Sequence, residues 1–207
     1  MKTPRLLAVD PSVTCSGWAL FCLKSSTLLG VGRVKSAPSS NPFNLRLADL
    51  QQKISAVLET PKLGSNDILI AEGPTSMKDP DAAIKVEQVR SMFETLGRTL
   101  GMQVPGRINP RTVQYEVMGL KGRQMPREEV KSHACGTAKL LYGEALKSIG
   151  FSEIDKLASY QDIVDAILVG HLALTKIESA NSAGILLEEY LEPERRKNGN
   201  KSRLRAV

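Results

Sequence analysis

The sequence predicts an α/β domain in which short buried strands come first and longer amphipathic helices follow. Short apolar segments rich in strand-forming residues predict the strands, and later segments repeat apolar residues at helical spacing. Two of the predicted strands end in a carboxylate, at Asp10 and at Glu72. With 207 residues, 42% of them hydrophobic and 24% charged, the chain has the length and composition of one globular domain with a substantial core.

The N-terminal third of the chain predicts three neighbouring strands. Residues 6–9 form an apolar run that ends at Asp10 and Pro11, which is typical of a buried strand with a carboxylate at its end. Residues 17–23 and 27–35 are also rich in strand-forming side chains, and only short polar links separate the three segments. We therefore expect an antiparallel meander.

The middle of the chain predicts a helix, a strand and a longer helix. Apolar residues recur at helical spacing through residues 45–58, and residues 67–72 form a buried strand that ends at Glu72. The Asp-Pro-Asp sequence at residues 79–81 is typical of a helix start and predicts a helix over residues 80–100. The apolar arc of this helix is wide, which indicates burial on more than one side, including against a partner subunit.

The remainder of the chain is predicted to be mainly helical. Pro105 and Gly106 limit residues 102–108 to a short or edge strand. Helices are expected over residues 110–118, 126–142 and 161–178, with residues 143–159 irregular or weakly helical and a break at residues 181–184.

The last predicted helix carries two carboxylates on an otherwise apolar segment. Asp162 and Asp165 are three residues apart, so they lie on one face of the helix. Like charges beside a buried surface are costly unless a cation lies near them. With Asp10 and Glu72 they make four carboxylates that can hold two divalent metal ions for phosphodiester cleavage. The alternative, that each acid caps an element or pairs with a base, is disfavoured for all four together.

Basic residues form a second set of candidates. The net charge of +6 and the sequence pI of about 9.3 favour a polyanionic partner. Basic side chains cluster in residues 107–131, where glycines let the loop follow a nucleic-acid backbone, although a solvated charged surface remains the alternative. The basic end of the chain is expected to be disordered and is either an arm on nucleic acid or a solvated tail. The candidate DNA-binding residues are Arg107, Arg111, Lys121, Arg123, Arg127 and Lys131.

Other polar residues suggest no second kind of chemistry. The three cysteines have no paired spacing, which argues against a disulfide framework or a zinc site. His171 is turned away from the Asp165 face and is expected to pack or to lie at the surface. No apolar run reaches the ~18 residues of a membrane span, and Asp10 interrupts the first run before it resembles a signal peptide. We expect the protein to stay where it is made, in a cytoplasm or an equivalent compartment.

Several of these segments, taken in order, resemble the RuvC Holliday junction resolvases. The matching residues are 7–11 (LAVDP), 17–19 (GWA), 70–73 (IAEG) and 162–166 (DIVDA), together with 109–110, 118–119 and 126–130. The resemblance reaches from the first strand to about Thr175.

The resemblance implies an RNase H-like fold, with a mixed five-stranded sheet flanked by helices, and a homodimer that nicks a four-way DNA junction symmetrically with magnesium or manganese. It implies that Asp10, Glu72, Asp162 and Asp165 are the catalytic, metal-binding acids and that the helix at residues 80–100 forms the dimer interface. Arg127 falls near a basic position that the family uses at its active site. On this basis residues 1–180 are the nuclease domain and residues 181–207 a C-terminal extension.

This chain also departs from the family. Ser12 stands where the family usually has glycine, and Thr75 stands where well-known members have an aromatic residue that disrupts junction bases. Such divergence suits a phage or organellar relative. The resemblance therefore implies a place in the cytoplasm of a bacterial cell, in the host cytoplasm if the protein is phage-encoded, or in an organelle. A broader nuclease of forks and flaps therefore stays open, as does a DNA-binding module without catalysis. An actin-like ATPase is a further alternative, but the glycine-rich phosphate loops that it needs are not found.

Overall fold

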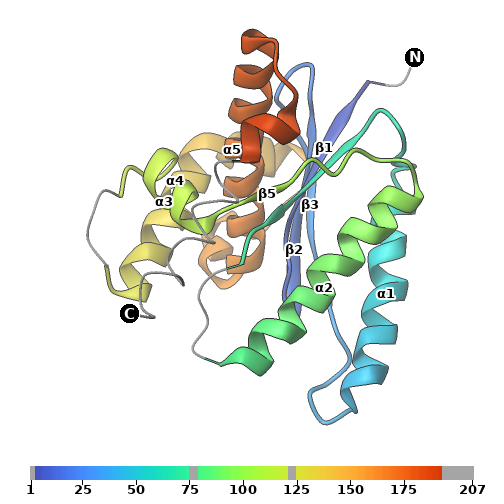
Figure 1. Cartoon of the computed structure of the whole chain (residues 1–207). Helices are drawn as coiled ribbons and strands as arrows, with labels where there is room; N and C mark the ends of the chain where they lie inside the picture. Colours follow the sequence, from blue (N-terminus) through green and yellow to red (C-terminus); the bar gives the residue numbers. More distant parts are fainter. Residues whose placement is uncertain (1–2, 75–78, 121–124, 193–207) are drawn as a thin grey trace, which may run out of the picture.

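The computed structural model describes residues 3–74, 79–120 and 125–192. A five-stranded sheet lies between two layers of helices, which confirms the predicted α/β class (Figure 1). The elements are β1 (Arg5–Asp10), β2 (Cys15–Cys22), β3 (Leu28–Lys35), α1 (Phe43–Glu59), β4 (Ile68–Glu72), α2 (Pro80–Thr99), β5 (Arg107–Ile108), α3 (Pro110–Glu116), α4 (Arg127–Ser148), the 3-10 helix η1 (Ile154–Ser159) and α5 (Gln161–Ala183).

The strands follow the order β3-β2-β1-β4-β5. β1, β2 and β3 pair antiparallel, as the predicted meander requires, and β4 and β5 join parallel to β1. Val9 of β1 pairs with Ala71 of β4, so the residues that follow them, Asp10 and Glu72, end neighbouring parallel strands at one edge of the sheet. The sheet is therefore mixed, and its two strand-end carboxylates lie side by side.

Each face of the sheet carries its own hydrophobic core. Leu6 and Ala8 of β1 pack toward α3, α4 and α5, whereas Leu7 and Val9 pack toward α1 and α2. Successive side chains of a strand point to opposite faces, so Asp10 shares the α5 face with Leu6 and Ala8. Figure 1 shows α1 and α2 on one side of the sheet and α3, α4 and α5 on the other.

Two helices are longer than the sequence predicted. α4 continues to Ser148, so the expectation that residues 143–159 are irregular or weakly helical was wrong for its first turns. Leu146 is fully buried in the core, and this packing outweighs the cost of Gly143 inside the helix. α5 continues to Ala183 and ends at Gly184, which has φ 67° and is the left-handed cap that glycine adopts without strain.

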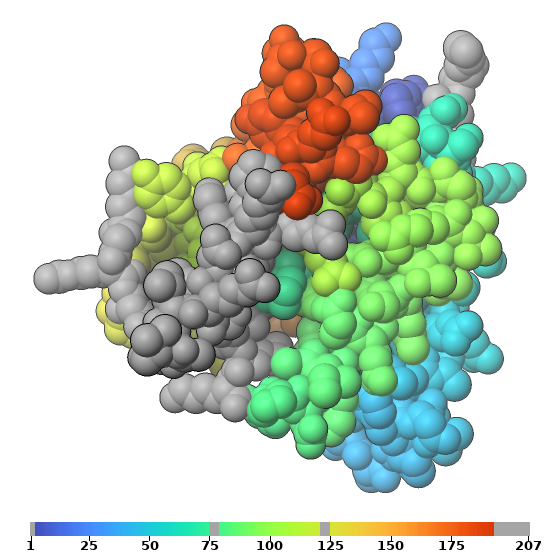
Figure 2. Space-filling model, viewed as in Figure 1, coloured from blue at the N-terminus to red at the C-terminus, as the bar shows by residue number. Residues whose placement is uncertain are grey.

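Beyond Gly184 the chain turns back onto the domain. Residues 187–192 are helical, and Leu191 is buried in the core against Gly106. Figure 2 shows this orange-red segment lying against the yellow-green chain before β5. A domain boundary after residue 180 stays a prediction, and the basic end of the chain lies outside the described residues. None of the helices in the described part of the chain is long and apolar enough to cross a membrane.

Candidate active site

The candidate active site lies at the sheet edge where β1 and β4 end. Asp10 closes β1 and Glu72 closes β4, and a hydrogen bond joins their side chains. The first turns of α5 supply Asp162 and Asp165 above the same edge. The charges of the other three acids all act on Asp10, so the structure brings together the four carboxylates that the sequence predicted.

The protonation of these acids reflects burial and mutual repulsion. Burial, followed by the charge of Glu72, raises the pKa of Asp10 well above its usual range. Burial, followed by the charge of Asp165, raises the pKa of Glu72 to about 7. Burial also raises the pKa of Asp165 to about 6, although a hydrogen bond from Gln161 opposes this change. The cluster therefore retains protons at a pH where isolated carboxyl groups are ionised.

Asp67, at the other end of the sheet, shows how a buried acid is ordinarily stabilised here. Burial alone would raise its pKa, but hydrogen bonds from Arg5 and from the backbone N–H of Gly64 lower it below the usual value. Arg5 and Asp67 form an ion pair at 2.7 Å. The acids of the candidate site repel one another instead, and the nearby cations offset only part of the rise in the pKa values of Glu72 and Asp165. Such repulsion is typical of functional sites.

The position of α5 over the sheet depends on two glycines. A Cβ atom on Gly17 of β2 would lie well within 3.0 Å of the carbonyl oxygen of Asp162. A Cβ atom on Gly170, two turns further along α5, would lie within 3.0 Å of the Phe21 ring. The absence of both side chains lets α5 approach β2 closely, which places its N-terminal carboxylates beside Asp10.

The donor chemistry of the cluster suits a hard divalent cation. Carboxylate oxygens are the ligands that magnesium and manganese prefer, and a cation would offset the repulsion that raises these pKa values. Within residues 3–74, 79–120 and 125–192, no group of three or more His, Cys, Asp or Glu side chains is already arranged to hold a metal ion. The fit therefore rests on the donors and their electrostatics.

A cleft of about 290 Å³ opens beside the carboxylates, between α3, α4 and α5. Glu72 and Asp165 line it together with Arg127 and Lys131 of α4. The charges of Lys131 and Arg127 both lower the pKa of Asp165, so the two cations lie close to the carboxylates. A negatively charged group that entered this cleft would meet both cations at the edge of the acidic cluster.

The other predicted DNA-binding residues lie in different surroundings. Arg107 donates hydrogen bonds of 2.6 and 3.0 Å to Glu94 and also pairs with Glu87, so its guanidinium is engaged within the protein. Arg111 is exposed at the start of α3. Lys121 and Arg123 lie outside the described residues, as does Thr75. The contact of these residues with DNA stays a prediction.

Three supporting residues were not identified from the sequence. Arg90 is buried and donates a 2.7 Å hydrogen bond to the backbone carbonyl of Glu72. Gln161 donates a 2.8 Å hydrogen bond to Asp165. Cys15 forms a hydrogen bond with Asp162, and burial, followed by this contact, raises the pKa of its thiol to about 11. Gln161 lies four residues before Asp165, a helical spacing from which this contact could have been predicted.

His171 packs, as predicted, away from the carboxylates. Its Nδ1 atom lies 2.9 Å from the hydroxyl oxygen of Tyr142, and the two rings meet edge to face. Burial lowers the pKa of His171. Phe21 also packs in the core, where its ring and that of Tyr142 meet edge to face. These aromatic contacts hold α4 and α5 together in the core beneath the site.

Comparisons with solved structures identify the fold. No protein-family model and no curated protein sequence matches the chain. A Thermus thermophilus RuvC in complex with a Holliday junction substrate is 18% identical, with a TM-score of 0.58 over 86% of this chain and 96% of that chain. A second Thermus thermophilus RuvC structure is 17% identical, with a TM-score of 0.56 over 86% and 96%. The fowlpox virus Holliday junction resolvase is 14% identical, with a TM-score of 0.52 over 84% and 98%. These likenesses, together with the mixed sheet and its flanking helices, give the chain a RuvC-like, RNase H-type fold.

Proposed function

We propose that this protein is a metal-dependent endonuclease that resolves four-way DNA junctions by paired, symmetric nicks. One observation carries the proposal. Carboxyl groups from two strand ends and one helix meet at a sheet edge, and burial and repulsion raise the pKa of Asp10, Glu72 and Asp165. The structures with a similar fold include a RuvC bound to a Holliday junction and a viral Holliday junction resolvase, which supports a junction as the substrate.

The four carboxylates would hold magnesium, or manganese, with two ions in each active site. Bound there, the ions would supply Lewis-acid activation of water and stabilisation of the leaving 3′ oxygen. Neighbouring residues would orient the metal-binding carboxylates. Gln161 holds the Asp165 side chain by its hydrogen bond, and Arg90 holds the backbone carbonyl of Glu72. Arg127 and Lys131 would neutralise the phosphate as it enters the cleft beside them.

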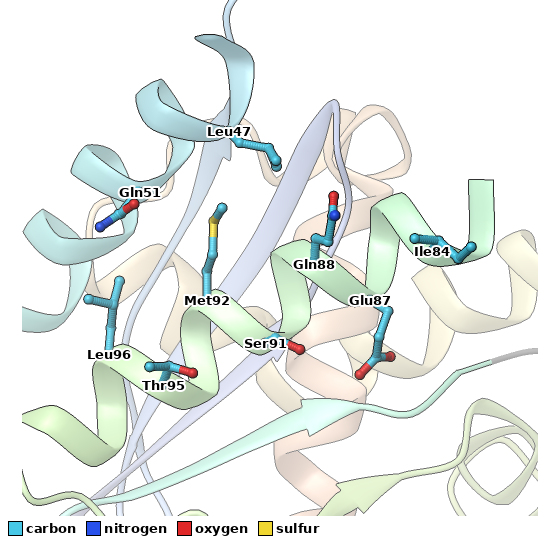
Figure 3. A pocket seen from close by; sticks show the side chains of 9 residues that line it. All are labelled: Leu47, Gln51, Ile84, Glu87, Gln88, Ser91, Met92, Thr95 and Leu96. Carbon is cyan, nitrogen blue, oxygen red and sulfur yellow. The ribbon is translucent and has the colours of Figure 1, made fainter. Parts of the chain in front are cut away.

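Paired nicks in two strands require two active sites, and we propose that α2 forms the homodimer interface. A groove of about 550 Å³ runs between α1 and α2 (Figure 3). Apolar side chains of Leu47, Met92 and Leu96 line it together with polar side chains such as Gln51 and Gln88. Ile84, at one end of this groove, is 59% exposed. An isologous contact through this face would bury it and set two active sites in a symmetric pair.

The dimer is tested by measuring molar mass in solution with Ile84→Glu beside Tyr115→Glu, which alters an exposed residue on α3. The wild type and Tyr115→Glu are expected to be dimers and Ile84→Glu a monomer. A monomeric wild type, or a dimer that Ile84→Glu leaves intact, would refute this interface.

The nuclease activity is tested by cleavage of a synthetic immobile four-way junction in magnesium, compared with a fork, a flap and linear duplex. We expect paired nicks on the junction alone and loss of cleavage in Asp10→Asn. Equal cleavage of forks and flaps would instead identify a broader branched-DNA nuclease. Tight junction binding without cleavage in magnesium or manganese would contradict the enzymatic proposal and favour a binding module.

A further inference from the structure

Two cations on the edge strand of the sheet lie in register with the acidic cluster. Across three adjacent strands, Asp10 of β1 pairs with Gly17 of β2, and Gly17 pairs with Arg33 of β3. Cys15 and Lys35 form the next pair on the same face. Paired residues of a sheet share a face, so Arg33 and Lys35 point to the side on which Asp10 and α5 lie.

The N-terminus of α5 lies between these cations and Asp10. The carbonyl of Asp162 rests against Gly17, and the Arg33 guanidinium stacks 4.2 Å from the centroid of the Tyr160 ring, directly before α5. Cys15, which contacts Asp162, pairs directly with Lys35 across β2 and β3. The two cations thus flank the carboxylates on the β3 side, whereas Arg127 and Lys131 flank them on the α4 side.

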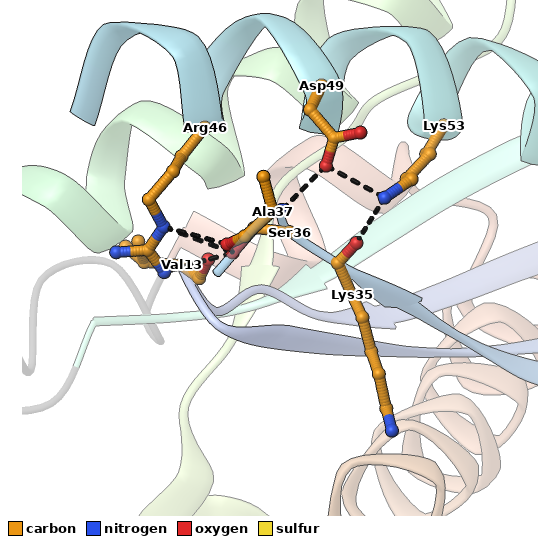
Figure 4. A network of polar contacts seen from close by, with 7 residues as sticks. All are labelled: Val13, Lys35, Ser36, Ala37, Arg46, Asp49 and Lys53. Carbon is orange, nitrogen blue, oxygen red and sulfur yellow. Dashed lines mark hydrogen bonds and ion pairs between the residues drawn. The ribbon is translucent and has the colours of Figure 1, made fainter. Parts of the chain in front are cut away.

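Both charges on β3 are available for an anionic ligand. Within the part of the chain that the structure describes, neither Arg33 nor Lys35 forms an ion pair with a carboxylate. Lys35 is exposed, and Figure 4 shows its side chain pointing away from α1, while its backbone carbonyl accepts a hydrogen bond from Lys53. Stacking on an aromatic ring leaves the N–H groups at the edge of a guanidinium free to bind phosphate.

We propose that Arg33 and Lys35 form a second phosphate-binding site, which holds the backbone of the cleaved DNA strand beside the scissile phosphate. This inference rests on the proposed nuclease function. With strands spaced by ~4.8 Å, the backbone of Arg33 lies about 10 Å from that of Asp10, so the bound phosphate is a neighbour of the reacting one. The strand would then be held from the α4 side and from the β3 side as it crosses the carboxylates.

Junction affinity across a range of salt concentrations tests the site, with Asp10→Asn present in every protein so that magnesium can be kept without cleavage. We compare Arg33→Gln and Lys35→Gln with Lys24→Gln, which removes the same charge from the exposed hairpin at the opposite end of β2 and β3. Each of the first two is expected to bind roughly three- to ten-fold more weakly and to reduce the slope of log affinity against log salt by about 0.9. Lys24→Gln should change neither quantity.

Two further measurements separate phosphate contact from a structural role of the stacked Arg33. Arg33→Lys keeps the charge and should restore most of the salt slope even if its thermal stability falls. A single uncharged methylphosphonate beside the cleaved bond should weaken binding by the parent protein and have a smaller effect on Arg33→Gln, because part of the contact is already lost.

The inference is overturned if Arg33→Gln and Lys35→Gln bind the junction with the affinity and salt slope of Lys24→Gln while the wild type binds and cuts normally. That result leaves the proposed nuclease function intact. If the wild type itself neither binds nor cuts branched DNA, both proposals fail, and the failure is visible before any variant is compared.

Discussion

Asp165→Asn is expected to stabilise the metal-free protein while abolishing its cleavage of DNA. The substitution removes a charge that burial and Asp162 disfavour. It keeps a side-chain oxygen that can accept the 2.8 Å hydrogen bond from Gln161. The side chain also keeps its size, so the core of α5 is not disturbed.

The raised pKa of Asp165 sets the size of this stabilisation and the way it changes with pH. The pKa of Asp165 is raised from 3.8 to about 6 in the folded state. This shift corresponds to about 3 kcal/mol of unfolding free energy, and partial exposure reduces it to roughly 1–3 kcal/mol. Because the pKa is raised, the stabilising contribution of the proton is present below pH 3.8 and is lost as the pH rises through 6. The gap between variant and wild type therefore opens between pH 4 and 7 and is complete at pH 8.

Urea unfolding in EDTA at pH 5 and pH 8 measures the difference in unfolding free energy between Asp165→Asn and the wild type. In a thermal melt the Tm should rise by about 2–4 °C for each kcal/mol of this difference. Glu178→Gln, at an exposed position on the same helix, is the matched control and should change stability little at either pH. Magnesium should then stabilise the wild type more than Asp165→Asn, because only the wild type keeps the full set of carboxylates. An Asp165→Asn protein that is less stable than the wild type at pH 8 in EDTA would refute the reasoning, as would equal stabilisation of both by magnesium.

Three further predictions concern the same site. Magnesium affinity measured by calorimetry should fall as the pH is lowered from 8 to 6. Glu72 and Asp165, with pKa values of about 7 and 6, must lose protons to bind the ion. An affinity independent of pH would contradict this prediction. Arg90→Met removes a charge that lowers the pKa of Glu72 and a hydrogen-bond donor to the Glu72 carbonyl. Magnesium binding should therefore weaken roughly tenfold, and the pH at which magnesium binding is half-complete should rise. An unchanged pH midpoint would count against this role of Arg90. Gly17→Ala forces α5 away from β2 and should lower the free energy of unfolding by roughly 1–3 kcal/mol and remove most of the cleavage rate. Gly30→Ala, whose Cβ meets only ordinary contacts at 3.6 Å, should lower the unfolding free energy and the cleavage rate less.

Local sequence patterns were sufficient for the secondary structure around the site. Residues 6–9 are apolar and end at Asp10, and the spacing of Asp162 and Asp165 places both on one helix face, so these features follow from neighbours along the chain. The helix ends were less predictable. α4 passes through Gly143 because Leu146 is buried against elements distant in sequence, and tertiary packing of this kind outweighs local propensity.

Sequence alone therefore determined the α/β class, the antiparallel meander and the four candidate acids, because each follows from apolar runs, short links or residue spacing within a local stretch of chain. Only the tertiary structure decided how the segments meet. In the tertiary structure Arg107 forms ion pairs with Glu94 and Glu87, and Arg90 donates a hydrogen bond to the backbone carbonyl of Glu72. Strand pairing through Gly17 brings Arg33 into register with Asp10. These relations depend on strand register and on the close approach of α5 to β2, which arise from contacts between residues far apart in the chain.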